Sequence, residues 1–123
     1  MSAAAKPTRG KPASVASADA ADQYMRGMRD RDSDAVFKSL SPDMQQALEK
    51  RTGKRGSAAV GALFAEQDRV GERTVGYKLI ASYQTVQGNM VHFYVVQDQR
   101  GDQQREIPYT LTLADDGTVA NVE

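Results

Sequence analysis

The stretch that decides the fold runs from Thr74 to Val122 and reads TVGYKLIASYQTVQGNMVHFYVVQDQRGDQQREIPYTLTLADDGTVANV. Apolar and polar side chains alternate along it with a period of two, which is typical of β-strands with one buried face. The alternation stops at Gly88-Asn89, Gly101-Asp102 and Asp116-Gly117, which are pairs that favour tight turns. The stretch therefore predicts four antiparallel strands, over about residues 74–83, 90–99, 104–113 and 118–122.

The alternation also predicts which side chains of the sheet face the core. We assign the odd-numbered ones to it, namely Val75, Tyr77, Leu79, Ala81, Tyr83, Val91, Phe93, Val95, Ile107, Tyr109, Leu111 and Leu113. His92, Asp98 and Glu106 then fall on the opposite face. The sequence therefore predicts that the space between the sheet and the helices contains no acid and no base. A bulge near Pro108 would exchange the faces locally. Pro108 lacks a backbone donor and is therefore expected at an edge position or a bulge.

Before Thr74 the apolar residues recur with a helical period. Ala21, Tyr24, Met25 and Met28 stand at i, i+3, i+4 and i+7, which predicts a helix from about Asp19. Capping residues and glycines mark three further helices. We expect these over residues 35–40, from Ser41-Pro42-Asp43 to Gly53, and from Gly56-Ser57 to about Gly71.

Together these elements predict an α+β fold. Three to four N-terminal helices should pack on a curved four-stranded antiparallel sheet, because each helical stripe needs an apolar partner. The chain has 123 residues, enough for one ordinary domain, which we place at residues 18–123.

The first 17 residues, MSAAAKPTRGKPASVAS, differ in composition from the rest. They offer too little apolar surface to offset the entropy of ordering them, which predicts a flexible tail or linker. No apolar run of a signal peptide follows the basic residues. Such mixtures often join an export signal or a membrane anchor to a domain. We therefore favour the extracytoplasmic part of an exported or tethered protein, with a cytoplasmic protein as the alternative.

The overall composition excludes several kinds of partner and site. Sixteen Lys and Arg balance sixteen Asp and Glu, so no net field attracts nucleic acid. There is no cysteine and a single histidine, which excludes thiolate chemistry and a multi-histidine metal site. We expect no metal, no cofactor and no membrane insertion of this segment. A basic cluster, Lys50-Arg51 and Lys54-Arg55, is interpreted as a helix cap, with phosphate or an acidic partner as the alternative.

Several local strings resemble the nuclear-transport-factor-two-like (cystatin-like) superfamily over about residues 18–123. They are Ala35-Val36-Phe37, Leu40-Ser41-Pro42, the strand Tyr109–Leu113 and the turn Asp116-Gly117. Many members carry a tryptophan after that glycine, where this chain has Val119. The resemblance implies a cone-shaped domain with a pocket at its open end and, frequently, a homodimer. It implies no activity, because the fold hosts enzymes, carriers and structural modules.

Two groups of residues are candidates for function. The first would line a ligand pocket, unless its rings simply fill a small core: Tyr24, Met28, Phe64, Tyr77, Tyr83, Phe93 and Tyr109. The second would form an apolar stripe on the outer face of the sheet, covered by a second copy of the chain, unless it is scattered surface: Ile80, Met90, His92, Tyr94 and Val96.

The sequence thus favours a non-catalytic, tethered module that binds a partner protein or a small apolar ligand. The alternative is a small lyase or isomerase of the polyketide-cyclase or ketosteroid-isomerase type, with tyrosine hydroxyls polarising a carbonyl. Such an enzyme needs an acid or a base in its pocket. A third possibility is a tethered domain of a secretion or conjugation assembly, which resembles known uses of the fold.

Overall fold

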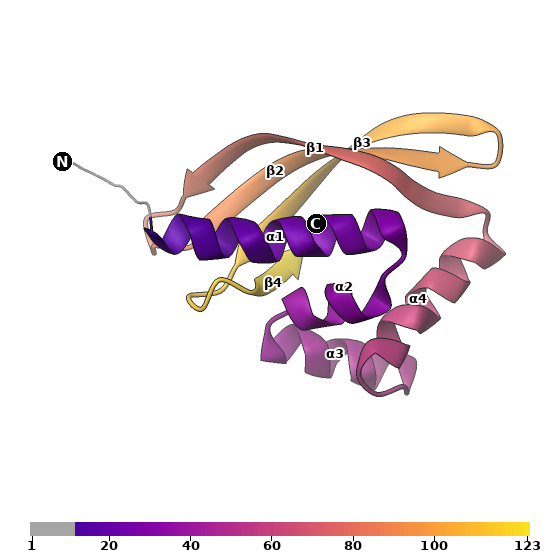
Figure 1. Ribbon diagram of the computed structural model, residues 1–123, viewed down its shortest axis with the longest axis horizontal. Coiled ribbons are helices and arrows are strands. Elements are labelled where there is room, and N and C mark those ends of the chain that lie inside the picture. The colour runs from indigo at the N-terminus through magenta and orange to yellow at the C-terminus, as the bar shows by residue number, and fades with distance from the viewer. Residues whose placement is uncertain (1–11) are drawn as a thin grey trace.

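The computed structural model describes residues 12–123 as four helices followed by a four-stranded antiparallel sheet (Figure 1). The helices are α1 (Pro12–Asp30), α2 (Ser33–Ser39), α3 (Pro42–Thr52) and α4 (Ser57–Arg69). The strands are β1 (Glu72–Gln84), β2 (Met90–Arg100), β3 (Gln103–Leu113) and β4 (Val119–Val122), in the order β1-β2-β3-β4. The predicted α+β fold is confirmed, and the sheet is not closed into a barrel.

The helices cover one face of the sheet. In Figure 1, α1 lies along this face, and α2 and α3 lie on the far side of α1 from the long strands. α4 leads back to the start of β1. The largest fully buried side chains join the two layers: Met25 of α1, Val60 of α4, Leu111 and Leu113 of β3, and Val119 of β4.

Local capping sets the helix boundaries much as the sequence predicts. The Asp32 carboxylate accepts from the Ala35 amide at 3.1 Å and caps α2. The Ser41 hydroxyl accepts from the Met44 amide at 3.3 Å, with Pro42 in the first turn of α3. Gly53 ends α3 in the left-handed conformation, at φ 73°.

Helix α1 begins at Pro12, seven residues before the predicted start. Residues 12–17 of the predicted tail are therefore helical, and the remainder of that tail lies outside the described residues. A proline fits the first turn of a helix because a backbone N–H at that position would have no acceptor within the helix.

The face assignment is wrong for β2 and for the second half of β1. Tyr94 pairs with Tyr109, and cross-strand partners share a face, so the even-numbered residues of β2 meet the odd-numbered residues of β3. The buried side chains of β2 are accordingly His92, Tyr94, Val96 and Asp98, whereas Phe93 is exposed and Val91 and Val95 are only half-buried. The odd-numbered residues of β3 do face the helices, as predicted, and Glu106 stays exposed on the outer face.

Two bulges in β1 explain its change of face. The register with β2 shifts between Thr74 and Gly76, and again between Leu79 and Ala81. Each shift adds one residue to β1, and one extra residue exchanges the faces of everything beyond it. Tyr77 consequently faces the helices, whereas Tyr83 is 58% exposed. No shift occurs at Pro108, which lies on β3 beyond the residues that pair with β4.

Candidate functional site

The principal cavity is an apolar cleft of about 280 Å³ between the helices and the last strand. All four helices and β4 contribute to its wall. Its lining residues are Tyr24, Met28, Val36, Leu40, Met44, Leu48, Arg51, Leu63 and Val122. The wall thus consists of aliphatic and thioether groups with one phenol and one guanidinium. We refer to it below as the helical cleft.

Helix α3 forms the outer wall of the helical cleft. It has no fully buried residue, although Met44 and Leu48 pack against the core from its inner side. A second hollow, of about 160 Å³, is lined by Met44, Ala47, Leu48 and Arg51. Since both hollows share Met44, Leu48 and Arg51, the apolar surface continues from the cleft onto α3.

A pair of hydrogen-bonded tyrosines adjoins the cleft, and one of them, Tyr24, belongs to its wall. The hydroxyl oxygens of Tyr24 and Tyr109 are 3.0 Å apart and hydrogen-bonded, which joins α1 to β3. Burial is the main cause that raises the pKa of each phenol, so both are neutral at physiological pH. The Tyr24 hydroxyl is therefore engaged by the protein itself, although its ring lines the cleft.

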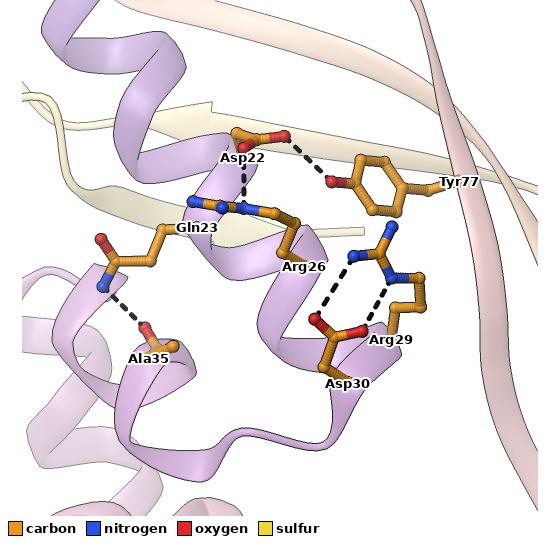
Figure 2. Close-up of polar contacts among 7 residues, drawn as sticks. All are labelled: Asp22, Gln23, Arg26, Arg29, Asp30, Ala35 and Tyr77. Atoms are coloured by element: carbon orange, nitrogen blue, oxygen red, sulfur yellow. Dashed lines mark hydrogen bonds and ion pairs between the residues drawn. The ribbon is translucent and has the colours of Figure 1, made fainter.

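A second polar cluster ties α1 to β1 outside the cleft (Figure 2). The Tyr77 hydroxyl donates to Asp22 Oδ1 at 2.9 Å, and Arg26 Nε lies 2.9 Å from Asp22 Oδ2. The Arg29 guanidinium covers the Tyr77 ring at 5.5 Å and pairs with Asp30 at 2.8 Å. Both oxygens of the Asp22 carboxylate have partners, so this cluster orients α1 on the sheet.

The single histidine lies on the helix-facing side of the sheet. His92 is 4% exposed, its ring is edge-on to Tyr94 with 6.3 Å between centroids, and its Nδ1 lies 2.6 Å from Ser82 Oγ. Its Nε2 is buried without a partner among the described residues. The predicted absence of an ionisable group on this face is therefore wrong. However, His92 does not line the helical cleft.

Burial lowers the pKa of His92 below its ordinary value near 6.5, which predicts a pH-dependent stability. Because the unfolded chain binds the proton more readily, acidification from pH 7 toward pH 5 should favour unfolding. The midpoint of thermal unfolding should fall over this range in the wild type and fall less in His92→Gln. Equal slopes in the two proteins would contradict this assignment.

Asp98 is the other ionisable group that the sequence placed on the wrong face. It is buried beside Thr74, its β1 partner, and accepts from Arg105 at 3.0 Å. Arg105 also pairs with Glu72 at 3.3 Å. This ion-pair cluster stabilises the end of the sheet near the β2–β3 turn and does not border the cleft.

The candidate pocket residues are only partly brought together. Tyr24 and Met28 line the helical cleft, and Phe64 is in the core. Tyr77 and Tyr109 lie on the helix-facing side of the sheet without lining the cleft. Tyr83 and Phe93 are 58% and 41% exposed on the outer face, so their prediction is wrong.

The predicted dimer stripe is also wrong as a surface. His92, Tyr94 and Val96 are buried against the helices, and Met90 packs partly against the core. Ile80 alone of the stripe is an exposed hydrophobic side chain, at the second bulge of β1. The outer face instead exposes Tyr83 and Phe93. A homodimer stays a prediction, and its interface would have to form through residues other than those of the predicted stripe.

Sequence reasoning missed most of the cleft. Met44 and Leu48 are not among the predicted pocket residues, and the sequence favours a capping role for Arg51. The sequence signal for the cleft is the sparse apolar stripe of α3. This stripe is too short to bury the helix, so the inner side of α3 packs loosely.

Among the described residues, no group of three His, Cys, Asp or Glu side chains could hold a metal ion. No helix in the described part of the chain is long and apolar enough to cross a membrane. Comparison with known proteins finds no family model, no curated protein and no solved structure that matches the chain, so its function is inferred from its own geometry.

Proposed function

We propose that this chain is a non-catalytic binding module that holds a small apolar ligand in the helical cleft. The observation that carries the proposal is the cleft itself, a hollow of about 280 Å³ with a mostly apolar wall. Ligand sites are typically concave and apolar with few polar groups, and their volumes begin at about 300 Å³. Transfer of an aliphatic chain from water into such a wall is favourable by about 0.8 kcal/mol per buried CH₂.

The composition of the wall favours binding over catalysis. An isomerase or lyase needs an acid or a base within hydrogen-bond reach of its substrate. The lining side chains supply one phenol, already bonded to Tyr109, and one guanidinium. His92 is the group that an enzyme would use, and it lies outside the cleft. We therefore expect a bound ligand to be recovered unchanged.

The wider setting remains part of the proposal. A cone-shaped domain of the nuclear-transport-factor-two-like superfamily, held by a tether, would suit a carrier or a recognition module. The α+β architecture supports this interpretation at the level of fold class. The superfamily itself, the tether and a partner protein stay predictions.

Filling the cleft should weaken binding strongly. Leu48→Trp places a larger side chain on the wall, and we expect it to weaken binding of 1-octanol by about tenfold or more, as measured by calorimetry. The matched control is Leu79→Trp, the same substitution at a half-exposed position of β1 outside the cleft. It should bind as the wild type does.

Circular dichroism checks that both variants fold, and Met44→Trp provides a second way to fill the cleft if Leu48→Trp does not. The proposal is contradicted if filled variants bind as well as the wild type, or if neither 1-octanol nor octanoate binds the wild type.

A further inference from the structure

We propose that the ligand of the helical cleft is an anionic amphiphile, an aliphatic chain of about eight carbons with a carboxylate head held by Arg51. This inference rests on the proposed function and adds the chemical class of the ligand. It is carried by the cationic group on the wall, by the charges around it and by the size of the cleft.

Arg51 is the charged group of the cleft wall. It lines both hollows, is exposed to solvent and makes no ion pair or side-chain hydrogen bond with another described residue. Most other arginines of the described chain differ in this respect. Arg26, Arg29, Arg31, Arg69 and Arg105 each contact an acidic side chain within 4 Å.

The surroundings of Arg51 reinforce its positive charge. Lys50 and Lys54 belong to the same exposed cluster and also form no ion pair with a described residue. The nearest acidic residue along the helix, Glu49, is already engaged, because its carboxylate accepts from the Gly56 amide at 2.7 Å and lies 3.9 Å from Arg55. Among the described residues, the positive charge of Arg51 is therefore not neutralised by an acidic side chain in ion-pair contact with it.

Carboxylate is the anion that suits both the guanidinium and the apolar wall. The guanidinium is a planar fork that binds a carboxylate through two parallel hydrogen bonds. Capping of α3 does not require Arg51, since Lys50 in the same last turn can interact with the carbonyl end. The remaining polar residue of the wall, Tyr24, has its hydroxyl bonded to Tyr109. Arg51 is therefore the wall residue that can bind a polar group, which favours a ligand with a single polar end.

The volume sets the length of the chain. At about 30 Å³ for a water-sized group, a cleft of 280 Å³ accommodates on the order of nine such groups. Octanoate, with its head at Arg51 and its chain against Met28 and Leu63, is of this size. A much longer chain would extend over the hollow along α3.

The test compares three probes with an eight-carbon chain by calorimetry at low salt: octanoate, 1-octanol and octyltrimethylammonium. We expect the wild type to bind octanoate about fivefold more tightly than 1-octanol, because the carboxylate adds a charge-assisted bond to the exposed guanidinium. Arg51→Gln should bring octanoate to the affinity that the same variant has for 1-octanol. Arg51→Lys, which keeps the charge but loses the fork, should be intermediate.

Lys54→Gln is the matched control, because it removes one positive charge from the same exposed cluster outside the cleft wall. It should retain most of the preference for octanoate. Equal affinity of the wild type for octanoate and 1-octanol, tighter binding of the cation, or an equal loss in Lys54→Gln would overturn the assignment of the head group while leaving the proposed cleft intact. If neither octanoate nor 1-octanol binds, the proposed function fails and this inference fails with it.

Discussion

Gly27→Ala should destabilise the protein by about 2 kcal/mol, although alanine is the better helix former. A Cβ on Gly27 would lie 2.6 Å from Val36 Cγ2, 3.1 Å from the Val36 nitrogen and 3.2 Å from the Asp32 carbonyl oxygen. Val36 cannot turn aside easily, because it is buried and its β-branched side chain has one favoured rotamer in a helix. Helix α2 would have to move away from α1.

The matched control for this prediction is Gly61→Ala in α4. No atom lies within 4 Å of a Cβ built there, so the substitution should stabilise the protein by about 0.5–1 kcal/mol. Urea unfolding of the two variants should therefore shift the midpoint in opposite directions. A stabilised Gly27→Ala would contradict the close approach of α1 and α2, which positions one side of the helical cleft.

Two neighbouring valines of β2 should differ sharply when each is replaced by alanine. Val96 is buried against the helices and pairs with Tyr77 and Ile107, so Val96→Ala should cost about 2 kcal/mol from lost burial and the cavity left behind. Val95 points to the outer face and is only half-buried. Val95→Ala should cost less than about 1 kcal/mol.

The free energy of unfolding of each valine variant, from urea titration, checks this prediction. The comparison is internal, because the same atoms are removed from adjacent positions of one strand. A larger loss of stability at Val95 than at Val96 would contradict the assignment of the β2 side chains to the two faces of the sheet. It would also contradict the interior position of His92.

The sequence predicts the elements well because their signals are local. The Ser41 cap with Pro42 marks the start of α3, and the pairs at Gly88, Gly101 and Gly117 mark the turns between strands. These features depend on a few neighbouring residues, so they can be recognised before any tertiary contact is known.

The face of β2 could not be recognised in the same way because both faces of the strand are apolar. Tyr94 and Val96 alternate with Phe93 and Val95, so the pattern alone does not choose between them. The length of the turn does fix which residues of β2 and β3 share a face. Gly101-Asp102 separates Arg100 from Gln103, its partner, so an even-numbered residue must pair with an odd-numbered one throughout this hairpin.

The bulges of β1 and the helical cleft arise from tertiary packing. Ile80, at the second bulge, carries no sequence signal that distinguishes it from an ordinary strand residue. The cleft exists because α3 packs on its neighbours without burying any of its own residues. Such imperfect packing is a property of several elements together, and no single stretch of sequence encodes it.

The most direct test of the helical cleft is an isotope-filtered nuclear Overhauser experiment on the protein saturated with octanoate, with the Met and Leu methyl groups and the Tyr and Phe rings labelled. We predict contacts from the aliphatic chain to the methyl groups of Met28, Met44 and Leu63. Contacts confined to Tyr83 and Phe93 on the outer face of the sheet, or no contacts at saturation, would contradict a ligand site between the helices.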